Sequence, residues 1–321
     1  MNGYEQIVKH LPAAALFDSV RGLNRPYRLL SGIARRVELA TYTSISAGIE
    51  LRYLLSKWAF LRHTVFFLYG DYDLYLAAML RTSRRLLAAA LHNPPNELRR
   101  RLGDAEHLRK CDGIVCLGSN VLEFLQDRRI DVKTAVVPHG VDTDFFSPCE
   151  GYRRERRVLI VGWHLRDWEL TRQVLAGLRR AEPEIRVDVV GPAAVRDELP
   201  KEEWIQIHEW VDDEKLREFY WKSGLLLYLP SDCVASNAVV EAMSCGLPVV
   251  TVNRGAVKEY VSPGCGLICN RASAAQVVDA ALSIIRDESL AECLGRTARA
   301  RAMELDWKRV AAEITGFLEG L

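Results

Sequence analysis

The chain has 321 residues, of which 49% are hydrophobic, and this is enough for two ordinary domains with separate cores. Its formal net charge is only +1, and no apolar run approaches the roughly 20 residues of a membrane-spanning helix. The N-terminus lacks the basic-then-apolar order of a secretory signal, and the eight cysteines form no C-x-x-C pair. We therefore expect a globular, cytoplasmic protein with reduced thiols.

The first 148 residues predict a parallel α/β sheet, because short apolar runs alternate with helical periodicity. Asp71 and Asp73, which are separated by Tyr72, have the spacing of a carboxylate pair that shares a divalent ion. They open a helix, however, where acidic side chains favour the dipole, so we predict no metal site. The predicted segments are a helix over 4–10, a strand over 37–42, a helix over 46–62, and strands over 64–69, 86–91, 112–117 and 133–137.

A polar, charged segment over residues 149–157 predicts a linker to a second sheet. Asp212 and Asp213 mark the start of a helix. The predicted strands of this half cover 158–161, 186–190, 205–211, 225–229, 247–252 and 266–269, and its last helices cover 272–286, 288–304 and 306–319.

Residues 224–261 combine a strand buried on both faces, a loop, a helix and a second strand. The helix begins near Ser236 or Asn237 and ends at Gly246. Its free N–H groups favour an anion such as a diphosphate. Glu241, one turn in, cannot hold phosphate but can accept hydrogen bonds from the two hydroxyls of a ribose. The pair of features predicts a nucleotide site, and the alternative is that Glu241 only caps an interior helix.

The stretch SNAVVEAMSCGLPVV, followed by GAVKE, resembles the nucleotide-sugar site of retaining glycosyltransferases of the GT-B fold. These form the glycogen-synthase-like superfamily, also called glycosyl transferases group 1. The resemblance implies an α/β protein with two Rossmann-like domains that face a cleft. We expect an acceptor domain over 1–148, a nucleotide-sugar domain over 149–305, and a last helix over 306–321 that crosses back. Because the family normally opens with a strand, the N-terminal domain either begins late or lacks its first strand.

The resemblance also implies roles for residues at the carboxyl ends of the strands. His92 contacts the transferred sugar or its phosphate, or else it only caps the following helix. Arg166 binds the diphosphate, or else it forms a surface pair with Asp167. The backbone around Trp210 and Val211 contacts the base. The whole predicted donor-binding set is Gly162, Arg166, Trp210, Val211, Ser236, Asn237, Ala238 and Glu241.

One position departs from the family pattern. The first motif glutamate falls at position 233, which is Cys233 here. Asp232 is adjacent, and a one-residue shift of the loop would turn it toward the sugar. We therefore predict His92, Asp232 and Arg166 as the catalytic residues.

The predicted function is transfer of a sugar from a nucleotide-sugar donor, UDP-linked or GDP-linked, to an acceptor with retention of configuration. No metal and no other cofactor are expected, and the acceptor is a glycan, a lipid-linked sugar or a small molecule. The alternatives are a non-catalytic nucleotide-sugar-binding subunit and a nucleotide-sugar epimerase. Residues 1–110 contain 17 Lys and Arg against 9 Asp and Glu, an excess of +8. These bases form solvated faces or contact the inner membrane surface, and they predict no nucleic-acid partner.

Overall fold

This computed structural model describes residues 4–12, 43–56, 63–152, 154–209, 211–270 and 273–321. The chain divides into two compact units. The C-terminal unit comprises the residues up to Gln6 and His139–Arg309, and the N-terminal unit comprises Ile7–Pro138 and Val310–Leu321. The chain thus passes between the units at Pro138, before the predicted boundary at 148, and its last residues return to the N-terminal unit.

The N-terminal unit contains a parallel four-stranded sheet in the order β1-β2-β3-β4. Its strands are β1 (His63–Phe67), β2 (Arg85–Leu91), β3 (Gly113–Cys116) and β4 (Lys133–Val136). β2 is a nearly continuous apolar run whose residues from Leu87 to Leu91 are all buried, as expected of a strand covered on both faces. The helices of this unit are α2 (Ser44–Leu54), α3 (Gly70–Asp73), α4 (Leu76–Met79), α5 (Pro95–Leu102), η3 (Glu106–Lys110) and α6 (Asn120–Asp127).

The predicted strand over 37–42 and the end of the predicted helix over 46–62 lie outside the described residues, and α2 itself ends at Leu54. The predicted opening helix over 4–10 is a 3₁₀ helix, η1 (Tyr4–Lys9). No helix among the described residues is long and apolar enough to cross a membrane.

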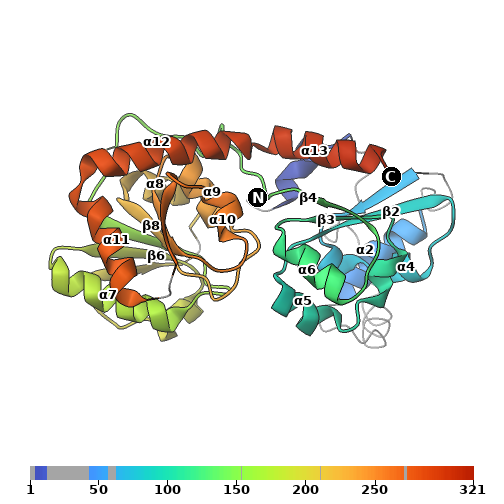
Figure 1. Cartoon of the computed structure of the whole chain (residues 1–321), viewed down its shortest axis with the longest axis horizontal. Coiled ribbons are helices and arrows are strands. Elements are labelled where there is room, and N and C mark those ends of the chain that lie inside the picture. The colour runs from blue at the N-terminus through green and yellow to red at the C-terminus, as the bar shows by residue number, and fades with distance from the viewer. Residues whose placement is uncertain (1–3, 13–42, 57–62, 153, 210, 271–272) are drawn as a thin grey trace. The chain divides into compact units, whose positions relative to one another are not determined.

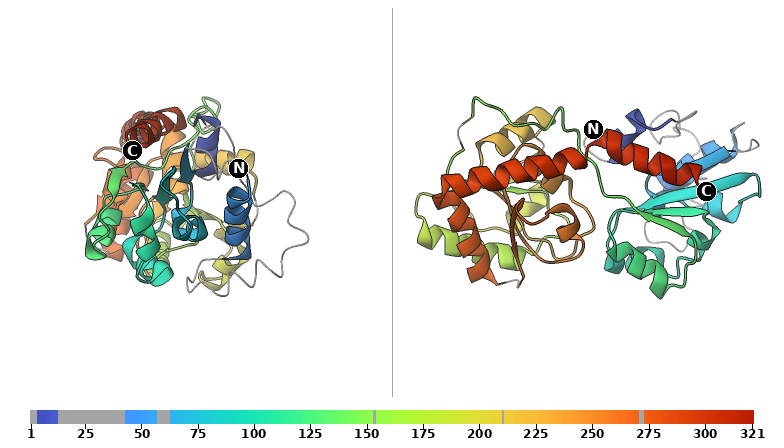
Figure 2. Two further views of the ribbon diagram at one scale, coloured as in Figure 1. Left: turned by 90° about the vertical axis from the view of Figure 1, so that its right-hand side faces the viewer. Right: turned by 45° about the horizontal axis from the view of Figure 1, so that its top comes forward.

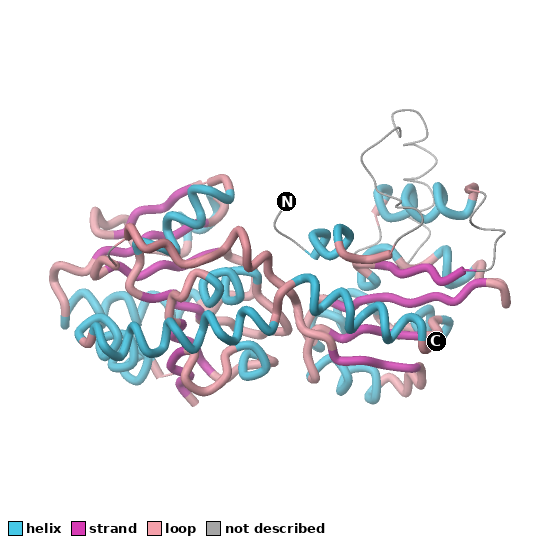
Figure 3. Tube along the Cα trace, turned by 90° about the horizontal axis from the view of Figure 1, so that it is seen from above, coloured by secondary structure: helices cyan, strands magenta, loops and turns pink. Residues whose placement is uncertain are grey.

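The C-terminal unit contains a parallel six-stranded sheet in the order β10-β9-β8-β5-β6-β7. Figure 3 draws the strands of both units in magenta and their helices in cyan. The strands are β5 (Arg157–Val161), β6 (Arg186–Val190), β7 (Ile205–His208), β8 (Leu225–Tyr228), β9 (Val249–Val252) and β10 (Gly266–Cys269). The chain builds outward from β5 to β7, returns to the other side of β5 with β8, and then builds outward again. This is the doubly wound order, whose ligand crevice lies where the direction reverses, between β5 and β8.

Helices cover both faces of this sheet. Figures 1 and 2 show α7 and α11 side by side, and their buried residues pack against Leu225 and Leu227 of β8. Residues of α8 and α9 pack against Leu226 and Tyr228. The alternation of side chains along β8 explains why the whole strand is apolar. The helices are α7 (Trp168–Ala181), η4 (Ala193–Asp197), α8 (Asp213–Lys222), α9 (Asn237–Ser244), α10 (Val257–Tyr260), α11 (Ala274–Arg286), α12 (Glu288–Glu304) and α13 (Trp307–Glu319).

The turn after Pro138 is held against the junction of α12 and α13 by backbone pairing. The N–H of Val141 donates to the Leu305 carbonyl at 2.9 Å, and the Trp307 N–H donates to the Val141 carbonyl at 3.2 Å. Trp307 is buried, and a Cβ at Gly140 would lie 2.4 Å from its ring. Only glycine fits this contact, so the turn and the helix junction form one packed corner of the C-terminal unit.

Candidate functional site

A pocket of about 280 Å³ opens at the carboxyl ends of β5 and β8, at the switch point of the six-stranded sheet. Every residue around it belongs to the C-terminal unit. The lining residues are Val161 at the end of β5, Gly162 and Arg166 in the loop after it, Leu216 on α8, and Ser236, Asn237, Ala238 and Glu241 at the start of α9. The structure therefore brings six of the eight predicted donor-binding residues to one pocket, whereas their roles stay predictions.

The loops after β5 and β8 are paired with each other. Arg166 and Pro230 form an isolated antiparallel bridge. The Asp167 N–H donates to the Leu229 carbonyl at 2.9 Å, and the Ser231 N–H donates to the Leu165 carbonyl at 2.9 Å. Both walls of the pocket are thereby joined by backbone hydrogen bonds.

Arg254 ties a third loop to these two. Its Nη1 donates to Oδ2 of Asp167 at 2.7 Å and to the Pro230 carbonyl at 3.0 Å. The same carboxylate accepts the Leu170 N–H at 3.0 Å and caps α7. Sequence reasoning missed Arg254. The available signal was its place in the loop after a buried strand, just before the GAVKE motif.

The first turn of α9 faces the pocket with its backbone donors. Ser236 is the N-cap in an extended conformation, and its side chain makes no capping hydrogen bond. The first N–H groups of a helix have no partner within the helix, and the dipole places partial positive charge beside them. This end of α9 can accept an anion.

The opposite end of α9 is held by two arginines. Arg154 donates to the carbonyls of Cys245 at 3.2 Å and Gly246 at 2.8 Å, and Arg299 donates to the Ser244 carbonyl at 3.0 Å. Cations at this end satisfy the last carbonyls and oppose the negative end of the dipole. The segment predicted as a linker therefore contributes a part-buried structural contact through Arg154, whose guanidinium donates to four backbone carbonyls.

Arg166 is fixed inside its own loop. Nη1 donates to the His164 carbonyl at 3.0 Å, Nη2 donates to the Val161 carbonyl at 2.8 Å, and the guanidinium lies 4.4 Å from the centre of the Tyr228 ring. Its buried Nε has no hydrogen-bond partner among the described residues. A guanidinium has five N–H donors, so donors remain for an anion in the pocket. Gly162 has φ +81°, and a Cβ there would lie 3.0 Å from Nη2.

Glu241 is buried and joined to α8. Its side chain is 4% exposed, and Oε2 accepts a hydrogen bond from the Tyr220 hydroxyl at 2.8 Å. Burial raises the pKa of Glu241 to about 7, although the Tyr220 hydrogen bond opposes this rise. The carboxyl group therefore changes charge near neutral pH, and in its ionised form it is an acceptor at the pocket wall.

The loop residues Asp232 and Cys233 do not line the pocket. Cys233 is 4% exposed, and its Sγ accepts a hydrogen bond from the Tyr228 hydroxyl at 3.2 Å. Burial raises the pKa of this thiol to about 11, so it is neutral. Oδ1 of Asp232 accepts the Cys233 N–H at 2.8 Å, which holds the carboxylate beside its own backbone. A catalytic role of Asp232 stays a prediction.

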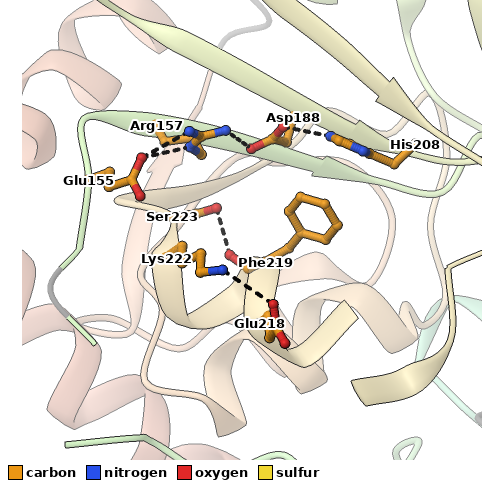
Figure 4. A network of polar contacts seen from close by, with 8 residues as sticks. All are labelled: Glu155, Arg157, Asp188, His208, Glu218, Phe219, Lys222 and Ser223. Atoms are coloured by element: carbon orange, nitrogen blue, oxygen red, sulfur yellow. Dashed lines mark hydrogen bonds and ion pairs between the residues drawn. The ribbon is translucent and has the colours of Figure 1, made fainter. Parts of the chain in front are cut away.

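His208 at the end of β7, where the base was predicted to bind, belongs to a network of polar contacts around the buried Asp188 (Figure 4). Asp188 is fully buried between Arg157 and His208, and its Oδ1 lies 2.7 Å from His208 Nε2. The His208 ring packs 4.5 Å from Phe219 of α8. Trp210 lies outside the described residues, and Val211 packs against the α8–α9 core without lining the pocket.

His92 lies in the N-terminal unit, at the carboxyl end of β2. Oδ2 of the buried Asp71 accepts the backbone N–H groups of His92 at 3.3 Å and Asn93 at 3.1 Å. The His92 ring lies 4.7 Å from that of Tyr69. Asp71 therefore shapes the turn that carries His92. Among the residues that the structure describes, no three His, Cys, Asp or Glu side chains are grouped as a metal site.

Comparisons with known proteins agree with this geometry. Residues 155–287 match the family model described as Glycosyl transferases group 1. Over 201 residues, 57% of this chain, the sequence is 27% identical to MMP alpha-(1->4)-mannosyltransferase of Mycolicibacterium hassiacum. The matched region is 47% of that protein, so the chain spans about half the length of this relative.

Two solved structures share the fold. Anabaena Alr3699/HepE in complex with UDP superposes with a TM-score of 0.69 at 16% identity, covering 87% of this chain and 83% of that one. Sucrose-phosphate synthase (tll1590) from Thermosynechococcus elongatus superposes with a TM-score of 0.68 at 14% identity, covering 97% of this chain and 82% of that one. The chain has the GT-B fold, and residues 155–287 of its C-terminal unit carry the match to the glycosyl transferases group 1 model.

Proposed function

We propose that this protein is a glycosyltransferase that moves a sugar from a nucleoside-diphosphate sugar to an acceptor. One observation carries the proposal: Arg166, the uncapped first turn of α9 and Glu241 line the same pocket at the switch point of the sheet. The pocket thus has positive potential at one point and, one helical turn away, a carboxylate that can accept hydrogen bonds. A nucleoside diphosphate presents the matching chemistry, two anionic phosphates next to two ribose hydroxyls.

The diphosphate occupies the start of α9, where Ser236 and Ala238 present backbone N–H groups. Negative charge on the diphosphate grows as the bond to the sugar breaks. The dipole of α9 and the Arg166 guanidinium are already in position, so they stabilise this charge without reorganising. We propose that this stabilisation replaces a metal ion.

Glu241 takes the ribose. The Tyr220 hydroxyl occupies Oε2, and Oε1 makes no hydrogen bond to another described residue. Ionised Glu241 then accepts from the ribose hydroxyls through its remaining lone pairs. The complex of the structural neighbour Alr3699/HepE with UDP supports UDP as the first nucleotide to test, and GDP is the second.

Retention of configuration and the roles of His92 and Asp232 belong to the same proposal. No side chain of the pocket is assigned as a nucleophile. His92 contacts the transferred sugar or its phosphate, and the acceptor is a glycan, a lipid-linked sugar or a small molecule.

Peripheral contact with an anionic membrane stays a separate proposal, and the described basic residues give it little free charge. Four described arginines of the N-terminal unit already form ion pairs with acidic side chains. Flotation with phosphatidylserine vesicles tests whether the protein binds an anionic membrane. The pairs are Arg81 with Asp112, Arg99 with Asp127, and Arg100 and Arg101 with Glu97.

A thermal-shift screen with UDP, GDP, ADP and their sugars tests the nucleotide. A ligand at about 100 times its dissociation constant stabilises the folded state by about 2.7 kcal/mol, which the screen detects. NMR of the bound sugar then separates the functions. Slow release of a sugar with unchanged anomeric configuration supports the transferase, binding without hydrolysis supports a non-catalytic subunit, and a changed sugar supports an epimerase. Absence of any nucleotide effect would overturn the proposal.

A further inference from the structure

Trp163 stands out among the tryptophans that the structure describes. It is 52% exposed and belongs to neither apolar core of the C-terminal unit, whereas Trp168 and Trp204 pack against one core and Trp221 packs against the other. It follows Gly162, which lines the pocket, and precedes Arg166, which lines it too. The exposed indole therefore lies on the loop that forms one wall of the site.

The loop holds Trp163 in place without burying it. The Arg166 guanidinium bonds the carbonyls of Val161 and His164, which flank the segment that carries Trp163. Leu165 has φ +52°, a left-handed conformation that fixes the turn. The ring of His164 meets the indole edge-on, with 6.1 Å between ring centres. An aromatic side chain on such a braced loop loses little conformational entropy when it binds a ligand.

The indole has two binding features, a flat apolar face and one N–H donor. A pyranose ring has the matching pair, a face of C–H groups and a rim of hydroxyls. We propose that Trp163 is the platform on which a sugar ring stacks beside the pocket. The inference rests on the proposed function, because that function brings a nucleotide sugar to the pocket and its diphosphate to Arg166, three residues after Trp163. It makes Trp163 a determinant of sugar specificity.

Two sources can supply the sugar ring, and separate measurements distinguish them. Isothermal titration compares UDP with UDP-glucose and GDP with GDP-mannose, for wild type and for Trp163→Ala. If the donor sugar stacks on the indole, the variant binds the nucleotide sugar about tenfold more weakly while its affinity for the bare nucleotide is unchanged. If an acceptor sugar stacks there, donor binding is unchanged, and binding to a glycan array in the presence of UDP is lost.

The controls isolate the aromatic face. Trp163→Phe retains a flat ring and should recover most of the affinity. Met303→Ala removes another exposed apolar side chain of the same unit, on α12, and should change nothing. Equal weakening of UDP and UDP-glucose in Trp163→Ala would place the base or the phosphates on the indole and overturn the inference.

The same experiment separates this inference from the proposed function. If the wild type binds nucleotides, and Trp163→Ala matches it for both nucleotide sugars and the glycan array, only the platform is refuted. If the wild type binds no nucleotide at all, the proposed function fails and the inference fails with it.

Discussion

The hydroxyl of Tyr220 donates a 2.8 Å hydrogen bond to Oε2 of Glu241, and both side chains are buried. The contact joins α8 to α9 directly behind the pocket. It gives a buried carboxyl group one donor and leaves its charge sensitive to pH.

The first prediction concerns the pH dependence of stability. Burial raises the pKa of Glu241 from its ordinary value of 4.5 to about 7. Between these values the folded protein holds a proton that the unfolded chain releases. The stabilisation that protonated Glu241 gives to the folded state is therefore complete below pH 4.5 and is lost as the pH rises through about 7. Across this window, the group lowers the free energy of unfolding of the wild type by up to about 1.4 kcal/mol per pH unit, and Glu241→Gln should lack this decrease.

Urea unfolding at several pH values across this window measures the effect. Glu150→Gln, which removes an exposed carboxylate of the same unit, is the matched control and should keep the wild-type profile. Superimposable pH profiles for wild type and Glu241→Gln would contradict the prediction.

The second prediction separates phosphate from nucleoside binding. Arg166→Ala should weaken UDP by about 1.5 to 3 kcal/mol, the range for hydrogen bonds to charged groups, and should leave uridine nearly unchanged. The variant also loses the Tyr228 stacking contact, so circular dichroism must first show that it is folded. Titration calorimetry with both ligands gives the comparison. An equal loss for UDP and uridine would refute the phosphate role.

The third prediction concerns Asp232. Asp232→Asn keeps an oxygen that can accept the Cys233 N–H, so the loop should stay folded and bind UDP normally. If the carboxylate handles the sugar, the variant should lose transfer, whereas Cys233→Ser should be mild. The rate of donor hydrolysis measures how the sugar is handled, and titration with UDP measures nucleotide binding. Transfer at the wild-type rate would show that Asp232 has no such role.

The family pattern suggests that Cys233→Glu would restore the missing glutamate and raise the rate, but the structure predicts a different effect. Cys233 is buried and faces a void of only about 10 Å³ between Tyr228 and Tyr260. A longer charged side chain does not fit there, and burying a charge without a partner is costly. Cys233→Glu should therefore destabilise the C-terminal unit instead of raising the rate.

The fourth prediction tests the contact between the loops that follow β8 and β9. Gly255 has φ +55°, and a Cβ there would lie 2.1 Å from the Cys233 carbonyl oxygen. That oxygen also accepts the Ala256 N–H at 2.9 Å. Gly255→Ala should lower the free energy of unfolding by about 3 kcal/mol or more, through strain and the broken contact. Gly151→Ala, where no atom lies within 4 Å of the added Cβ, is the control. Equal melting temperatures of the two variants would contradict this prediction.

Local sequence determined most of the C-terminal sheet. The predicted bounds of β6 and β10 agree with the structure, and α8 begins at Asp213 after the N-cap Asp212. These signals are short-range, because apolar runs, caps and helical periodicity act over a few residues. The sequence also indicated which residues would meet in the pocket, since the ends of parallel strands share one edge of a sheet.

Tertiary structure decided what surrounds those residues. Three hydrogen-bonded pairs join residues that are far apart in the sequence. Tyr220 and Glu241 are separated by 21 positions, Arg254 and Asp167 by 87, and Arg154 and Gly246 by 92. No periodicity encodes such pairs, because their partners come together only when the helices pack on the sheet. The sequence therefore located the helix at the pocket and its carboxylate, whereas long-range packing alone set the pKa of Glu241, the orientation of Arg166 and the burial of Cys233.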